Sequence, residues 1–174
     1  IHHYQVIGSK SPFNELTFKQ AKGLRGILKK EGLALPVYVG MRNWDPLLKD
    51  VLEMMSKDGI ENAIGIIRAP HQGEASWGRY QTAIQRCKEI LKQEKNYKTP
   101  AVYYCEPWFD HPMFIEAMVD QLQSEIDNIP IYLKNQTRVL FTAHSVPESL
   151  SHPYVQQIFK SCRAVASNLD GLGE

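Results

Sequence analysis

Short apolar runs alternate with longer amphipathic segments along the chain. Four runs are rich in β-branched and aromatic residues and have the length of strands buried on both faces: residues 36–40, 63–67, 101–105 and 137–142. Five other segments have apolar residues at helical spacing, and several begin at a proline: residues 15–30, 46–57, 76–94, 112–126 and 153–169. This alternation predicts βαβ units around a parallel sheet.

The segment 46–57 has the clearest helical pattern. Its apolar positions fall on one face, and Lys57-Asp58-Gly59 is a typical helix end that leads into the next strand. We expect this face to be buried and to consist of Leu48, Val51, Leu52 and Met55.

The fold class that these elements predict is α/β. We expect a three-layer sandwich in which a parallel sheet of four or more strands is flanked by helices, as in flavodoxin-like proteins. The 174 residues are enough for one domain with its own core, and they contain no repeat, linker or low-complexity segment. Residues 1–174 are therefore predicted to form a single domain.

Composition excludes several classes of protein. The 20 Lys and Arg residues nearly balance the 19 Asp and Glu residues, and no basic patch is interleaved with aromatics, so nucleic acid is not an expected partner. No apolar run approaches the roughly 20 residues that span a bilayer, and the first residues do not resemble a signal peptide. We expect a cytoplasmic protein with at most a peripheral contact with a membrane.

Three cysteines are widely spaced, and none belongs to a C-x-x-C pair that would indicate zinc binding or redox work. Cys87, Cys105 and Cys162 are predicted to be reduced structural thiols.

The residues best suited to chemistry follow directly after the predicted strands. In an open α/β sheet, ligands bind beyond the carboxyl ends of the strands, where side chains from separate loops converge. The sequence therefore predicts one cleft formed by Arg42-Asn43-Trp44, His71-Gln72, Glu106-Pro107-Trp108 and His144-Ser145.

Each of these residues also has a purely structural interpretation. His144 is well placed to exchange protons near neutral pH, but a lone histidine at a strand end, His71 included, is more often only hydrogen-bonded there. Arg42 fits a carboxylate clamp and a surface ion pair equally well. Trp44 and Trp108 are suited to hold a flat aromatic ligand, although partly buried packing is the commoner role of tryptophan.

Five motifs, taken in order, resemble the ferrochelatase family over nearly the whole chain. They are Tyr4-x-x-Ile7-Gly8-Ser9-x-Ser11-Pro12-x-Asn14, Val37-Tyr38-Val39-Gly40-Met41-Arg42-Asn43-Trp44-x-Pro46, Asp58-Gly59-Ile60 with Ala69-Pro70-His71, Trp108-Phe109-Asp110-His111-Pro112-x-Phe114-Ile115, and Phe141-Thr142-Ala143-His144-Ser145-Val146-Pro147-Glu148. The sequence departs from the family pattern at Ser9, at Gln72-Gly73 and at Ser151-His152.

The resemblance implies a chelatase-like fold and the insertion of ferrous iron into a porphyrin, a lyase reaction of heme biosynthesis. It gives His144 the role of catalytic histidine and transient iron ligand, and it makes Arg42, His71 and Ser145 contacts of the porphyrin. Iron is then a substrate, and no tightly bound cofactor is expected.

By the same resemblance, the first strand of the family fold precedes Ile1, and a carboxy-terminal domain with an essential glutamate follows Glu174. We expect the chain as given to be incomplete for activity. Two other hypotheses remain open at this stage. One is a non-catalytic module of the same fold that binds a tetrapyrrole or a metal. The other is a flavodoxin-like nucleotide-binding domain, which the missing phosphate loop disfavours.

Overall fold

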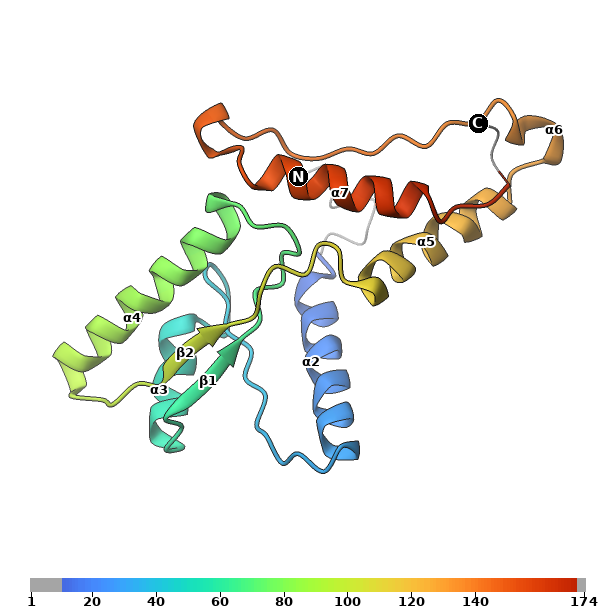
Figure 1. Cartoon of the computed structure of the whole chain (residues 1–174). Helices are drawn as coiled ribbons and strands as arrows, with labels where there is room; N and C mark the ends of the chain where they lie inside the picture. The colour runs from blue at the N-terminus through green and yellow to red at the C-terminus, as the bar shows by residue number, and fades with distance from the viewer. Residues whose placement is uncertain (1–10, 172–174) are drawn as a thin grey trace. The chain divides into compact units, whose positions relative to one another are not determined.

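The structure is a computed structural model that describes residues 11–171. Its helices and strands confirm the α/β class (Figure 1). Residues 4–10 of the first motif lie outside the described residues. In chain order the elements are α2 (Phe13–Lys30), α3 (Leu48–Lys57), β1 (Asn62–Gly65), the π-helical turn η1 (Glu74–Gly78), α4 (Arg79–Lys95), β2 (Ala101–Tyr104), α5 (Pro112–Asp127), α6 (Ile131–Lys134), the 3₁₀ turn η2 (Glu148–Leu150) and α7 (Tyr154–Ala166).

All five predicted helices are confirmed, with small differences at their ends. The segment predicted as 76–94 begins earlier, as η1, and continues as α4. Two short elements, α6 and η2, were not predicted. Each is at most four residues long, which is too short to produce a helical hydrophobic period.

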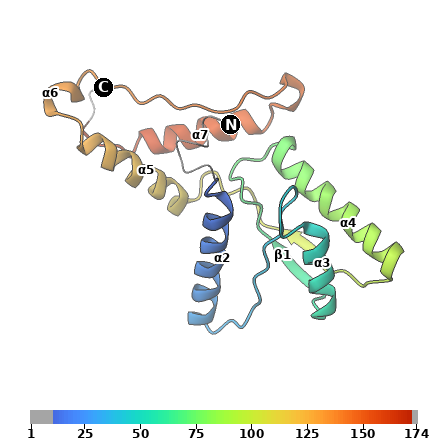
Figure 2. The same cartoon turned by 180° about the vertical axis from the view of Figure 1, so that it is seen from behind.

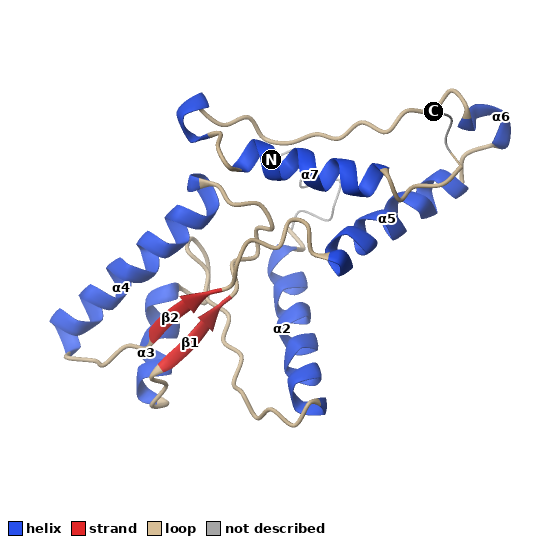
Figure 3. Cartoon of the chain, viewed as in Figure 1, coloured by secondary structure: helices blue, strands red, loops and turns tan. Residues whose placement is uncertain are grey.

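β1 and β2 form a parallel pair (Figure 3). The Ala101 amide donates to the carbonyl oxygen of Glu61 at 2.8 Å, and the Cys105 amide donates to that of Gly65 at 3.1 Å. Both partners advance by four residues between these bonds, so the two strands run in the same direction. Two of the four predicted strands are therefore confirmed.

The other two predicted strands are not strands in this structure. Residues 36–40 join no ladder, although the next residue, Met41, forms an isolated parallel bridge with Leu47. Residues 137–147 run alongside α7 without regular secondary structure (Figures 1 and 2), and Leu140 is 86% exposed. The described residues thus form a sheet of two strands and not the expected four. A β-rich segment becomes a strand only where a neighbouring strand accepts its hydrogen bonds, and none does so here.

The chain divides into two compact units, and each consists of two separate stretches of sequence. The first unit contains Ile1–Glu61 and Ala83–Ala101, and the second contains Asn62–Thr82 and Val102–Glu174. That residues 1–174 form a single domain stays a prediction.

The core of the first unit confirms the apolar face predicted for residues 46–57. Leu48, Val51, Leu52 and Met55 are all buried on α3. Gly40 lies so close to this face that a Cβ atom there would be 2.9 Å from the Leu48 Cδ2 atom. The predicted helix end is also confirmed: α3 ends at Lys57, and Gly59 has a φ of +72°, in the left-handed region that glycine favours.

In the second unit, α5 packs against α7, and Figure 2 shows this pair from behind. Ile115 and Ile126 are the buried residues of α5. On α7 the buried positions are Gln157, Ser161 and Val165, which recur every four residues. Two of these three buried side chains are polar, so this helix buries groups that need hydrogen-bond partners.

Candidate functional site

Two tryptophans hold the loop that follows β1. The Trp108 indole Nε1–H donates to the carbonyl oxygen of Ile67 at 3.0 Å, and the Trp77 Nε1–H donates to that of Ala69 at 2.8 Å. Trp77 is buried and Trp108 is half-buried. The packing role favoured for Trp108 is therefore confirmed, and its polar atom fixes the course of the backbone that leads to His71.

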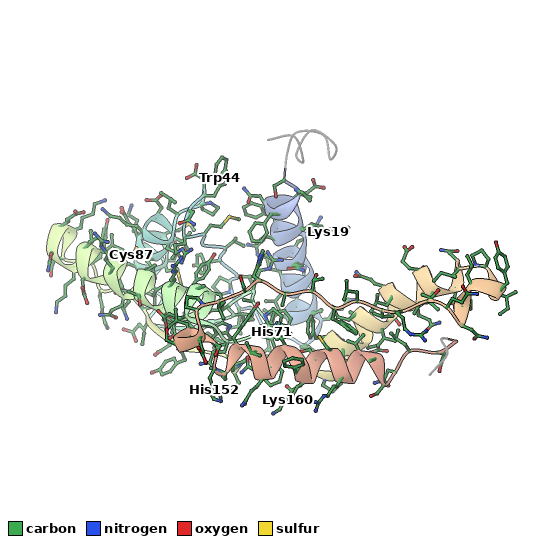
Figure 4. All side chains as sticks on the ribbon, turned by 90° about the horizontal axis from the view of Figure 1, so that it is seen from above. Lys19, Trp44, His71, Cys87, His152 and Lys160 are labelled. Carbon is green, nitrogen blue, oxygen red and sulfur yellow. The ribbon has the colours of Figure 1, made fainter. Side chains whose placement is uncertain are left out.

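Two buried polar residues of α7 form hydrogen bonds with the same loop. The His71 Nε2 atom lies 2.9 Å from the Ser161 hydroxyl oxygen, and the Gln72 amide donates to the Gln157 Oε1 atom at 2.6 Å. Gln157 and Ser161 are one helical turn apart, so both face the loop. His71 lies beside α7 in the side-chain view (Figure 4).

Three aromatic rings surround the imidazole of His71. The Phe109 ring is stacked on it, with ring centroids 6.3 Å apart and planes at 29°. Phe114 and Tyr154 meet it edge-on at centroid distances of 6.4 and 6.2 Å. We call His71, Gln157, Ser161 and these three aromatic residues the His71 cluster.

Burial sets the charge of this cluster. Desolvation lowers the pKa of the His71 imidazole from its usual 6.5, because the charged ring loses more hydration than the neutral ring. The ring is consequently neutral at neutral pH, and it has a lone pair that can accept a proton or a hydrogen bond.

His144 and Ser145 are exposed and lie in the irregular segment before η2. The strand end at which we expected His144 is absent, because residues 137–142 form no strand. Within residues 11–171, no side-chain hydrogen bond or ring contact joins His144 to the His71 cluster. The two predicted histidines therefore make no direct side-chain contact within the described residues.

A groove of ≈ 760 Å³ separates α5 from the residues that precede His144. Its walls are mainly apolar. They comprise Met118, Asp120, Gln121, Leu122, Ser124 and Glu125 of α5 together with Val139, Leu140, Phe141 and Thr142.

Arg42 and Trp44 belong to the other compact unit. Arg42 is half-buried and belongs to the loop that connects Met41 to Leu47, the two residues of the bridge. Trp44 is 66% exposed, so the packing role favoured for it is wrong in this structure. Trp44 lies in a series of bends, residues 42–46.

The three cysteines are free, half-buried thiols, as predicted. Burial raises the pKa of Cys87 and Cys162, which disfavours the reactive thiolate. In the described part of the chain, no three His, Cys, Asp or Glu side chains gather as they would around a metal ion. None of the described helices is long and apolar enough to cross a bilayer.

Sequence reasoning missed Gln157 and Ser161, although a signal for them exists. Gln157, Ser161 and Val165 are spaced by four residues along one helical stripe, and only the third is apolar. Polar residues at core positions of a helix indicate a buried hydrogen-bond network. The spacing alone does not identify the partner of that network, which comes from a loop about 90 residues earlier.

The parallel strand pair and the histidine loop that follows β1 define an α/β protein with a polar site after a strand end. The chain belongs to the ferrochelatase family, because the family model described as Ferrochelatase matches residues 1–174.

Similar proteins include a ferrochelatase of Deinococcus radiodurans, 31% identical over 95% of this chain and 52% of the relative. A coproporphyrin III ferrochelatase of Mycobacterium leprae is 33% identical over 95% of this chain and 48% of the relative. A ferrochelatase of Aquifex aeolicus is 32% identical over 96% of this chain and 51% of the relative. The chain thus spans about half the length of the curated relatives that it matches.

Proposed function

We propose that the complete protein inserts ferrous iron into a porphyrin in the cytoplasm, as a lyase of heme biosynthesis. The observation that carries this proposal is the family match over all 174 residues, with the ordered motifs inside it. Relatives named ferrochelatase and relatives named coproporphyrin III ferrochelatase match about equally well, so the proposal covers porphyrins as a class.

The reaction removes two protons from pyrrole nitrogens and gives their lone pairs to the metal. His144 is proposed to accept one of these protons or to be the ligand that passes iron to the ring, because imidazole binds ferrous iron and exchanges protons near neutral pH. The second proton passes to the glutamate that the family resemblance implies or to water. Its exposure supports this role, since the ring is accessible to a substrate. The open macrocycle nitrogens take the ion as the pyrrole protons leave.

Arg42, His71 and Ser145 are the proposed contacts of the porphyrin. The Arg42 guanidinium suits a porphyrin carboxylate through two parallel hydrogen bonds. The neutral His71 imidazole, held among three aromatic rings, offers a fixed polar atom beside apolar surface. The Ser145 hydroxyl adds a further donor next to His144.

We also propose that residues 36–40 and 137–142 join the sheet in the complete protein, which gives the four-stranded, three-layer chelatase-like fold. Exposed apolar side chains support this. Ile64 of β1 is 73% exposed, Tyr103 of β2 is 62% exposed and Leu140 is 86% exposed. Further strands and covering helices would remove such surface from water.

Because the chain spans about half of its relatives, we propose that the remaining part of the site lies outside these 174 residues. That part includes a second domain and the glutamate that the family resemblance implies. Porphyrin and ferrous iron are the proposed substrates, and no resident cofactor is part of the proposal.

The test is His144→Ala in the complete protein, with iron insertion into coproporphyrin III followed by absorbance. We expect insertion to slow roughly 100-fold or more, the usual contribution of a general base. His152→Ala, a change at another exposed histidine, is the matched control and leaves the rate unchanged. Insertion at the parental rate in His144→Ala would show that this histidine is not the base. If the parent binds coproporphyrin III or protoporphyrin and inserts iron into neither, the non-catalytic binding module replaces the enzyme.

A further inference from the structure

We infer that Ser161 of α7 is a positioning residue that holds the His71 imidazole in the tautomer with its proton on Nε2. The functional part of this inference rests on the proposed role of His71 as a porphyrin contact. The tautomer itself follows from the hydrogen bonds of the His71 cluster.

The Ser161 hydroxyl has one hydrogen and three neighbours. Its oxygen lies 2.6 Å from the carbonyl oxygen of Phe109, 3.1 Å from that of Gln157 and 2.9 Å from the His71 Nε2 atom. A carbonyl oxygen can only accept, so the hydroxyl hydrogen is directed to a carbonyl, and the Phe109 distance is the shortest.

Since that hydrogen is used, the Ser161 oxygen meets His71 as an acceptor. The imidazole must then supply the hydrogen, which places the proton on Nε2. In a neutral ring the other nitrogen, Nδ1, is left as a lone-pair acceptor. Within residues 11–171 no hydrogen bond occupies Nδ1.

The surroundings of the ring support a single orientation. The Phe109 ring stacks on the imidazole while the Phe109 carbonyl takes the Ser161 hydrogen, so one residue controls both the plane of His71 and the direction of its serine partner. Gln157 adds a second contact when it accepts the Gln72 amide at 2.6 Å. Both α7 side chains are buried, with Gln157 9% exposed and Ser161 7% exposed.

The tautomer decides whether the His71 Nδ1 atom accepts or donates a hydrogen bond to the porphyrin. With its proton on Nε2, His71 accepts a hydrogen bond at Nδ1 and cannot donate one there. The opposite tautomer would present a donor. Ser161 therefore determines which porphyrin group His71 is able to contact, although Ser161 itself touches only protein.

The tautomer is tested in the complete protein without porphyrin. Heteronuclear NMR of the imidazole nitrogens distinguishes the two neutral forms at about pH 8.5, above the usual histidine pKa. We expect the Nε2–H form in the parent and in Ser161→Thr, which keeps a hydroxyl. Ser161→Ala should give a mixture of both forms. Ser167→Ala, the same change at the exposed residue that follows α7, is the control and should retain the parental signals.

Porphyrin binding is tested separately, by quenching of coproporphyrin III fluorescence and by the rate of iron insertion. Ser161→Ala should weaken binding by up to about tenfold, the effect of one hydrogen bond, and should raise KM more than it lowers kcat. Ser161→Thr should restore the parental affinity, and Ser167→Ala should not alter it.

Three results would overturn the inference. An Nδ1–H form in the parent, or unchanged imidazole signals in Ser161→Ala, would show that Ser161 does not select the tautomer. A changed tautomer with parental affinity and KM would show that Ser161 is only structural. A parent that binds neither coproporphyrin III nor protoporphyrin contradicts the proposed function and the positioning role together, whereas the NMR result still decides the tautomer.

Discussion

At the scale of single residues, polar side chains in core positions carry the most information about the site. Gln157 and Ser161 occupy buried positions of α7 where apolar residues would be expected, and each contacts the loop after β1. Their burial is tolerated because each has a hydrogen-bond partner. The identity of His71 as a special residue could be inferred from its place after a predicted strand, whereas its partners could not.

His71 also makes stability depend on pH. Because burial lowers its pKa below 6.5, the folded protein binds this proton less readily than the unfolded chain does. As the pH falls through 6.5, the unfolded chain takes up a proton that the folded protein resists, and the free energy of unfolding decreases.

We predict that His71→Gln removes the part of the decrease in unfolding free energy at low pH that His71 causes. Glutamine does not titrate, and it keeps an N–H for Ser161. Urea unfolding at about pH 5 and pH 8, on either side of the usual histidine pKa, measures the change in the free energy of unfolding between these pH values. The decline between these values should be smaller in His71→Gln than in the parent, and His152→Gln at an exposed position is the control. Equal declines in parent and His71→Gln would contradict the prediction.

At the scale of elements, a carboxylate with two ion-pair partners joins α3 to α4, two helices that the sequence already predicted. The Glu53 carboxylate on α3 contacts the Lys57 ammonium one turn later at 2.8 Å and the Lys95 ammonium at the end of α4 at 2.8 Å. Hydrogen bonds from Lys57 and then from Lys95 lower the pKa of Glu53 from 4.5 to about 2. The first contact is readable from the i,i+4 spacing, but the second depends on how α4 lies against α3.

We predict that Glu53→Gln lowers the thermal midpoint at neutral pH. Because the folded pKa lies below the unfolded value, this stabilisation is present above pH 4.5 and is lost as the pH falls through about 2. The difference between parent and variant should therefore shrink in acid, and added salt should also reduce it.

Glu61→Gln is the matched control for this ion pair. Glu61 has a single partner, Lys98, and the two side chains are 66% and 82% exposed, whereas the Glu53 side chain is 15% exposed. Exposed ion pairs contribute little to stability, so Glu61→Gln should lower the thermal midpoint less than Glu53→Gln does. If the thermal midpoint falls no further in Glu53→Gln than in Glu61→Gln, the double ion pair does not stabilise the fold.

At the scale of the whole molecule, the sheet shows that local sequence pattern predicts which segments suit a strand but not which of them pair. Residues 63–67 and 101–105 lie on paired strands at nearly the predicted positions. Residues 36–40 and 137–142 have similar composition, yet they remain outside the sheet among the described residues. Strand propensity describes suitability for a sheet, and pairing requires a partner that is distant in sequence.

We predict that Leu140→Asp destabilises the complete protein, because the proposed fourth strand would bury this side chain. A buried charge should lower the free energy of unfolding by about 2 kcal/mol or more. Denaturant unfolding of the complete protein measures the loss.

Ile131→Asp serves as the control for this change. Ile131 on α6 is 81% exposed, and we expect its substitution to cost less than about 0.5 kcal/mol, as is usual for surface sites. If Leu140→Asp were as harmless as Ile131→Asp, residues 137–142 would not be a buried strand of the complete protein.

The sequence by itself determined the features that depend on neighbours along the chain. These are the five long helices, the buried face of α3, the glycine turn after it and the ordered motifs that place the chain in the ferrochelatase family. Helical periodicity and turn chemistry act over a few residues, so one sequence suffices to detect them.

Only the tertiary structure decided which strands pair and which residues surround His71. The His71 cluster unites the loop after β1, the turn before α5, the first turn of α5 and three positions of α7, and no local pattern connects these segments. Desolvation by this packing lowers the pKa of His71, and one hydroxyl hydrogen fixes its tautomer. Both effects arise from atoms that are close in space and far apart in sequence. The sequence therefore identifies the histidine as a candidate but does not predict its pKa shift or its tautomer.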